Sequence, residues 1–369
     1  MDAERSLFMQ LVTDLANQAI ASLAHPINEQ QIAESILEAS YHCLHNTETL
    51  APAHHAWSLK EARRIKKRRR HTAERTENRI LRRFAVTFDA WESLLSAAEL
   101  VNKLLVHALA RQLKEERHLH RSYLFGIQEE LGGPPLKTLV LTGMQARMTT
   151  YCGEILLLLR HGYHDGAHAR LRTLYEMSIK AWFICNNEPV PDGYQLAERY
   201  YVSARLEAPD PDELDAQDRE VLEKAREQWG ASFFRSSHGW AAPGINNPEK
   251  RVITFKDIED AVQGNLLRYI YLASNSAVHA GSKQVIATTI GASGPVLNTR
   301  PAFVPEQVAY VGATSIEILR MGTIQILQRI ARDACDWDVQ LQAAAFMWHA
   351  EKVRSLLGSR PEVTSLSFD

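Results

Sequence analysis

Several features that would place a sequence quickly in a functional class are missing from this one. Its four cysteines are scattered and form no CxxC pair, which argues against a disulfide framework and against a structural zinc site. No Walker, dinucleotide-binding, nucleophile-elbow or kinase motif occurs. The formal net charge of −2 leaves no overall surplus of cations for nucleic acid. We therefore expect a cytoplasmic protein with reduced thiols and no cofactor.

Long hydrophobic runs are also missing, since no segment approaches the ~20 continuous apolar residues that a membrane span needs. The N-terminus carries acids at Asp2 and Glu4 and repeats its apolar residues at helical spacing, which a signal peptide would not do. The sequence therefore predicts neither a membrane span nor an export signal.

Helical periodicity is present along most of the 369 residues. It predicts an all-α fold, a multi-helix bundle with an N-terminal helical extension. Residues 288–305 are compatible with strands, so we expect at most one short β-hairpin. The length suggests about two domains. The expected divisions are an N-terminal helical region at 1–131, a helical core domain at 132–357 and a C-terminal tail at 358–369.

Proline, glycine and capping residues predict where the helices begin and end. Residues 230–256 are rich in Gly, Pro, Ser and Asn and predict a long loop. The expected helices are 4–24 and 28–45, joined as a hairpin at Pro26; 84–130, which ends before the GGPP stop; two helices joined at HGYHDG, where Asp165 can cap the second; one helix over 253–281; a long helix opened by Pro305; and a shorter one near 338–357.

Positive charge is concentrated in residues 60–83, which contain twelve Lys or Arg against three acids, a local surplus of +9. Such a run is either a solvated helix face or linker, or a surface that binds phosphates. It contains no aromatic residue, which argues against stacking on nucleic-acid bases. If the run binds a polyanion, RNA is the expected partner, and Arg68, Arg69 and Arg70 are the candidate contacts.

The stretch YIYLASNSAVHAGS, residues 269–282, places polar residues inside a helical pattern. At about 100° per residue, Arg268, Asn275 and His279 share one helix face, and Ser274 lies just beside it. Ser and Asn are weak helix formers, so tertiary contacts are expected to hold them there. His279 is either a core histidine bonded by Asn275 or a site residue.

A second polar set lies in ARLRTLYEMSIKAWF, where Arg170, Arg172 and Glu176 interrupt an apolar helix. Arg172 and Glu176 are i,i+4 partners, and on an exposed helix such a pair contributes only ~0.3–0.5 kcal/mol. If the pair faces inward, it needs further partners, and Asn275 and His279 are the candidates. The sequence then predicts one connected network of Arg172, Glu176 and His279.

The segments LLRHGYHDGAHARLRTLYEMSIKAWF and YIYLASNSAVHAGS together resemble a bacterial helical family catalogued as a domain of unknown function, DUF5677, over roughly residues 137–285. That family is in turn similar to the HEPN superfamily of toxin and defence ribonucleases, whose site is an Arg and a His a few residues apart on one helix. Here the residue five before His279 is Ser274, and Arg268 lies eleven before it. The usual spacing is absent, so Arg172 would have to supply the cation.

Two hypotheses follow from the residues and the resemblance. In the first, the chain is a HEPN-like intracellular effector, an RNA-cleaving toxin or antiphage defence component that needs no metal. Its catalytic residues would be His279, Arg172 and Glu176, with binding roles for Ser274, Asn275, Arg268 and Arg170. In the second, the chain is a non-catalytic helical sensor or scaffold that uses the same polar cluster for structure or for binding a small ligand, or it is a partner-binding protein of a defence or stress system. Either form is expected to be a homo-oligomer.

The histidines His161, His164 and His168 raise the question of a metal site. The turn between Gly162 and Gly166 disturbs their helical spacing, and no set of carboxylates accompanies them. We therefore assign no metal ligand.

Overall fold

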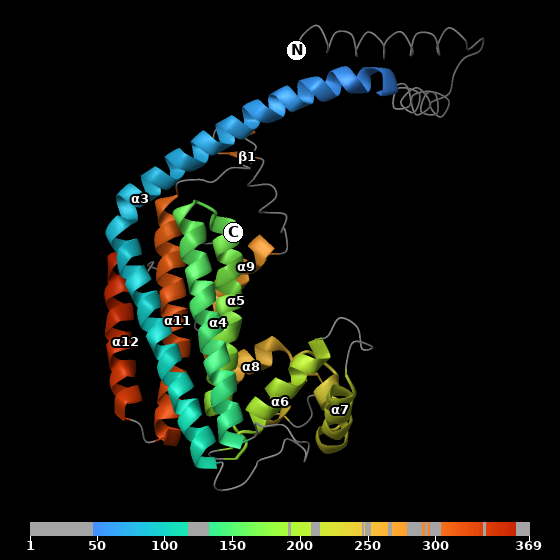
Figure 1. Cartoon of the computed structure of the whole chain (residues 1–369), viewed down its shortest axis with the longest axis vertical. Helices are drawn as coiled ribbons and strands as arrows, with labels where there is room; N and C mark the ends of the chain where they lie inside the picture. The colour runs from blue at the N-terminus through green and yellow to red at the C-terminus, as the bar shows by residue number, and fades with distance from the viewer. Residues whose placement is uncertain are drawn as a thin grey trace, which may run out of the picture. The chain divides into compact units, whose positions relative to one another are not determined.

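The computed structural model describes residues 47–116, 133–190, 193–207, 215–245, 247, 252–264, 268–278, 290–291, 294–295, 304–334 and 337–358 (Figure 1). The helical hairpin expected at 4–45 and the residue His279 lie outside these ranges.

The all-α fold predicted from the periodicity is confirmed. The only described strands are β1 (Ile290–Gly291) and β2 (Gly294–Pro295), which pair antiparallel and agree with the single short hairpin expected in that stretch. The helices are α3 (Thr47–Glu116), α4 (Gly133–Arg160), α5 (His164–Asn186), α6 (Gln195–Ser203), η2 (Ala204–Glu207), α7 (Ala216–Trp229), η4 (Ala231–Phe234), η5 (Gly239–Gly244), α8 (Phe255–Ala261), α9 (Arg268–Val278), α11 (Pro305–Ala334) and α12 (Trp337–Leu356).

The chain divides into two compact units, Met1–His71 and Thr72–Asp369. The described part of the first unit is the beginning of α3. In the second unit α4, α5 and α11 pack against one another, α12 packs on α11, α9 on α5, and α6 on α4 (Figure 1). The later part of α3 contributes Phe88, Trp91 and Leu94 to the same buried core.

α3 is a single helix of 70 residues, although the sequence suggested a charged segment at 60–83 followed by a separate helix from 84. No glycine or proline occurs between residues 53 and 116, so nothing in the sequence interrupts the backbone hydrogen bonds. The basic segment is therefore helical.

The turn between α4 and α5 uses Gly162, whose φ of 76° lies in the left-handed region that favours glycine. α5 begins at His164, so Asp165 lies in its first turn instead of at the capping position expected from the sequence. Pro305, in contrast, begins α11 as predicted.

The prediction of one continuous helix over 253–281 is wrong, because α8 and α9 are separate helices. Gln263 between them has a φ of 54°, and a Cβ on Gly264 would lie 2.6 Å from the Cδ1 atom of Ile179 on α5. α8 therefore ends at Ala261, and a side chain at position 264 would require the end of the Ile179 side chain to move.

The long loop predicted at 230–256 contains η4 and η5, and a buried arginine holds it in place. Arg199 of α6 is 3 % exposed and donates to the carbonyl oxygens of Trp240 at 3.1 Å and Gly239 at 3.2 Å. Its guanidinium lies over the rings of Trp229 and Phe233, at 4.8 Å and 5.1 Å from their centroids. Burial lowers the pKa of Arg199 to about 10, so the group stays charged at neutral pH.

Among the described helices, one contains a window long and apolar enough to cross a membrane by composition alone, within Ser58–Lys114 of α3. The sequence had predicted no span, because it contains no continuous apolar run of that length. The core helix of a soluble protein passes the same test, and Trp91, Leu94 and Val101 of this helix are fully buried in the bundle. The window is therefore weak evidence for a membrane span.

We predict that Gly322→Ala destabilises the protein by about 1–3 kcal/mol, because the new methyl group overpacks the junction of three helices. A Cβ at Gly322 of α11 would lie 2.6 Å from the sulfur of Met148 on α4 and 2.8 Å from Oγ of Ser178 on α5. Gly143→Ala is the matched control, since nothing lies within 4 Å of a Cβ there. That change should stabilise exposed helix by about 0.5–1 kcal/mol. Urea unfolding of both variants measures the difference, and equal effects would contradict the packing argument.

Candidate functional site

The Arg172–Glu176 pairing predicted from the spacing is confirmed, and it faces α9. The Arg172 Nε atom donates to Glu176 Oε1 at 3.0 Å, and Nη2 donates to the hydroxyl of Tyr271 on α9 at 3.0 Å. The guanidinium also lies 4.8 Å from the centroid of the Tyr271 ring. The side chains of Arg172 and Glu176 are 21 % and 28 % exposed, so the pair is partly accessible to solvent.

A buried layer connects this pair to α8. The Tyr175 hydroxyl lies 2.5 Å from Oε1 of Glu259 and 2.9 Å from the carbonyl oxygen of Gly264, so its one proton is shared between two acceptors. Glu259 has no exposed surface and forms an ion pair with Arg268, the first residue of α9. The buried carboxylate is therefore satisfied by one cation and one hydroxyl.

Aromatic rings fill the space between the two layers. The ring of Phe255 stacks on Tyr271 with centroids 5.3 Å apart and meets Tyr175 edge-on at 6.1 Å. His238 lies at the margin, 6.2 Å from the Phe255 ring. We call Arg172, Tyr175, Glu176, Glu259, Arg268 and Tyr271 the α5–α9 cluster.

Burial is the largest cause of the pKa shifts of three titratable groups in and beside the cluster. Burial, and then Glu259, raise the pKa of Tyr175, so its hydroxyl remains a donor. Burial, and then Glu176, raise the pKa of Tyr271. Burial, and then Lys180, lower the pKa of His238, so that ring is neutral at pH 7. With two cations and two carboxylates, the cluster carries no formal net charge.

The other residues predicted for the site are distributed differently. Arg170 points away toward α4, where its Nε atom lies 2.7 Å from Oε2 of Glu154. Ser274 has no exposed surface, and Asn275 is partly buried. Within the described ranges, neither Ser274 Oγ nor Asn275 Oδ1 has a hydrogen-bond partner. Arg268 joins the cluster through Glu259 instead of through the predicted stripe.

Sequence reasoning missed Tyr175, Glu259 and Tyr271. Tyr271 belongs to the singled-out stretch and could have been found, because it lies three residues after Arg268 on the same helix. No sequence pattern indicated Glu259. It is an acid in a short helix, and its burial depends on tertiary packing.

Two of the three histidines considered as metal ligands contact different residues. His161 Nδ1 lies 3.4 Å from Oε2 of Glu77, whereas His168 Nε2 lies 2.9 Å from Oε1 of Gln307. No group of three ligand-type side chains converges in the part of the chain that the structure describes.

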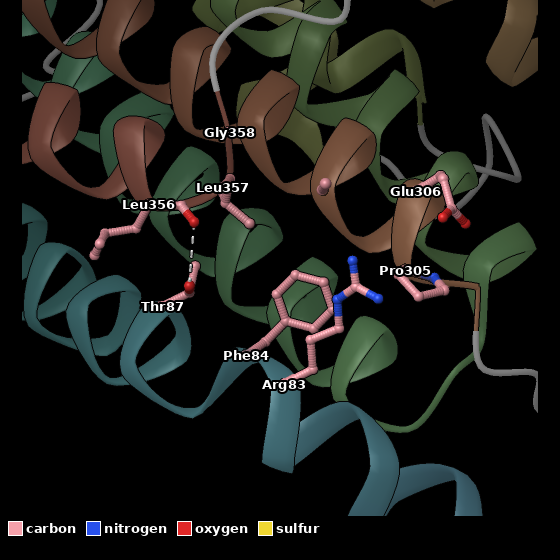
Figure 2. Close-up of a pocket in the computed structure, with 9 residues that line it drawn as sticks. Arg83, Phe84, Thr87, Pro305, Glu306, Leu356, Leu357 and Gly358 are labelled. Carbon is pink, nitrogen blue, oxygen red and sulfur yellow. Dashed lines mark hydrogen bonds between the residues drawn. The ribbon is translucent and has the colours of Figure 1, made fainter.

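A separate cavity of about 400 Å³ lies where α3, the start of α11 and the end of α12 meet (Figure 2). Phe84 and Leu357 form apolar walls, and the Arg83 guanidinium lies above the Phe84 ring at 5.7 Å. None of the lining residues comes from α5, α8 or α9, so the cavity does not belong to the α5–α9 cluster.

The basic segment on α3 is fully presented to solvent. Every side chain from residue 62 to residue 70 is exposed, and seven of these nine are Lys or Arg. The predicted contacts Arg68, Arg69 and Arg70 belong to this part of the first compact unit.

Comparison with known families matches residues 138–288 to the model of a Family of unknown function (DUF5677). Residues 138–288 are thus similar to this family. The domain contains α5, α8 and α9 and therefore the whole α5–α9 cluster, but it covers less than half of the chain. The searches of curated proteins and of solved structures found no match.

We predict that Arg268→Ala costs about 3 kcal/mol of stability, because it leaves the Glu259 carboxylate buried without a cation. Arg170→Ala is the matched control, because its pair with Glu154 is 48 % and 38 % exposed and should contribute only about 0–1 kcal/mol. Denaturant unfolding at pH 7 compares the two. An Arg268→Ala protein as stable as the control would show that Glu259 is not held as a buried charge.

Proposed function

We propose that this protein is a non-catalytic helical nucleic-acid-binding protein, a sensor or scaffold of a defence or stress system. The exposed basic segment at 62–70 is the observation that carries the proposal, since it has seven cations and no acid. Lys and Arg that neutralise phosphates release condensed counterions, which supplies most of the free energy of nonspecific nucleic-acid binding.

The α5–α9 cluster supports a structural role for the domain in this proposal. Arg172 is already engaged by Glu176 and Tyr271, so an incoming phosphate would have to displace a carboxylate from it. The four charges of the cluster cancel, whereas a phosphate-processing site needs an excess of positive charge. We therefore assign the cluster to fixing α8 and α9 on α5.

We expect the protein to bind a labelled 30-nucleotide RNA with an affinity that falls steeply as salt rises. Neutralising Arg68, Arg69 and Arg70 to Gln should flatten the plot of log affinity against log salt by about 0.7 for each lost contact with a single strand. Fluorescence anisotropy between about 50 and 200 mM salt measures the slope.

The control carries the same change in charge elsewhere, with Lys103→Gln, Lys114→Gln and Arg332→Gln at exposed positions. It should keep the wild-type slope. Equal flattening in both variants, or no RNA binding at low salt, would refute the proposal.

A HEPN-like ribonuclease remains the second candidate, and one observation favours it. Ser274 and Asn275 hold buried polar atoms that have no partner among the described residues, and such atoms often mark a functional site. α9 is described as far as Val278, and His279 is the next residue in the sequence. In this candidate His279 is the general acid–base group, Arg172 stabilises phosphate charge, and Glu176, Ser274 and Asn275 orient them.

The second candidate predicts that His279→Ala keeps the wild-type Tm but abolishes RNA cleavage and any growth arrest on overexpression. Activity lost by two or more orders of magnitude in a folded protein would favour the enzyme. Wild-type behaviour of folded His279→Ala would leave the binding protein as the remaining candidate. Light scattering tests the accompanying proposal of a homo-oligomer.

A further inference from the structure

The cations of the basic segment surround the helix instead of forming one stripe. At about 100° per residue, Arg64 and Arg68 project to one side, and Lys66 and Arg69 project about 150° away from them. The remaining cations of the run fill the third side, and they are Arg63, Lys67 and Arg70. All seven side chains are exposed. The widest interval without a cation is about 100°, between Arg68 and Arg69, and it contains Glu61 and Ile65.

The chemistry of the segment makes two kinds of polyanion weaker partners than a duplex. A helix that lies on a membrane surface needs an apolar face, and the only large apolar side chain between residues 62 and 70 is Ile65. Proteins that bind single strands stack bases on aromatic side chains, and the run from 60 to 83 contains none.

A helix with cations on opposite sides matches a groove with phosphates on both walls. The major groove of B-form DNA is about 12 Å wide and admits an α-helix, whose diameter with side chains is about 10–12 Å. The major groove of A-form RNA is deep and narrow and does not admit one in the same way. From residue 60 to residue 70 the helix is about 16 Å long, about half a turn of duplex.

Resting on the proposed function, we infer that residues 60–70 of α3 bind double-stranded DNA by lying in its major groove. The cations on opposite sides of the helix then contact the phosphates of both strands. The segment has no Asn or Gln with which to recognise adenine, so the base contacts open to it are those of Arg or Lys with guanine, and contacts with phosphates supply most of the affinity.

The test compares the full-length protein with two double variants of equal charge, Arg64→Gln with Arg68→Gln, and Lys66→Gln with Arg69→Gln. Gln keeps a helix propensity close to that of Arg and Lys, and circular dichroism checks that helicity is unchanged. The probes are a 20-base-pair DNA duplex, the RNA duplex of the same sequence, the single DNA strand and vesicles of phosphatidylserine and phosphatidylcholine, all at about 0.1 M salt.

We expect the DNA duplex to bind at least tenfold more tightly than either other nucleic acid. Each double variant should weaken duplex binding by a similar factor, on the order of 10- to 100-fold, because each loses contacts to one strand. A DNA duplex whose major groove is filled by glucosylated 5-hydroxymethylcytosine should bind no more tightly than the RNA duplex.

The contradicting outcomes separate the inference from the proposed function. If only one double variant loses affinity, or if RNA duplex and single strand bind as tightly as DNA, the protein still binds nucleic acid but the helix lies on the surface of its partner. If no nucleic acid binds, both proposals fail and the segment is a solvated face. Tighter binding to vesicles than to DNA would assign the segment to membranes and overturn both.

Discussion

A carboxylate without exposed surface stays charged only when a cation and hydrogen-bond donors replace its water, and Glu259 imposes this constraint on the domain. Its partners come from two other helices, Tyr175 on α5 and Arg268 on α9. The short helix α8, which could not form a stable core alone, is thereby fixed to both. Once α9 is held at Arg268, Tyr271 one turn later is placed to receive the Arg172 guanidinium.

These contacts converge on α5. Its two faces pack against their neighbours through different kinds of contact. Toward α11 the contact is close, because Gly322 leaves space for Ser178 and Met148, and Ser178 donates to the carbonyl oxygen of Ile318 at 3.2 Å. Toward α9 the contact is polar and aromatic. The apolar contacts supply burial, whereas the polar contacts require one arrangement of α8 and α9, since a shift would leave Glu259 without its partners.

The sequence predicted what depends on spacing along one helix. The all-α fold, the turn at Gly162, the start of α11 at Pro305 and the pairing of Arg172 with Glu176 all follow from local periodicity and backbone preferences. The periodicity also showed which residues of α9 share a face, but not which face is buried. Leu272, in the middle of the predicted polar stripe, is 53 % exposed, whereas Ile270 and Ser274 are buried.

The features that escaped prediction depend on tertiary contact. The break between α8 and α9 occurs where Ile179 approaches Gly264, and no residue pattern within 253–281 requires it. Glu259 is similar, because an acid in a short amphipathic helix normally faces water, and only Arg268 and Tyr175 make its burial tolerable. The site therefore combines a pair visible in the sequence with a buried layer visible only in the fold.

The two groups of arginines in this chain differ in how many acids lie near them in the sequence, and this difference supports the proposed place of polyanion binding. Arg172 and Arg268 each face a carboxylate of the domain. Between residues 62 and 70 no acid occurs. Glu61, just before this run, forms an ion pair with Arg64 at 3.8 Å. Residues 60–83 carry +9 while the whole chain carries −2, so the rest of the chain carries −11. In the proposed function, this distribution of charge favours contact of a polyanion with this helix over the rest of the chain and makes the affinity sensitive to salt.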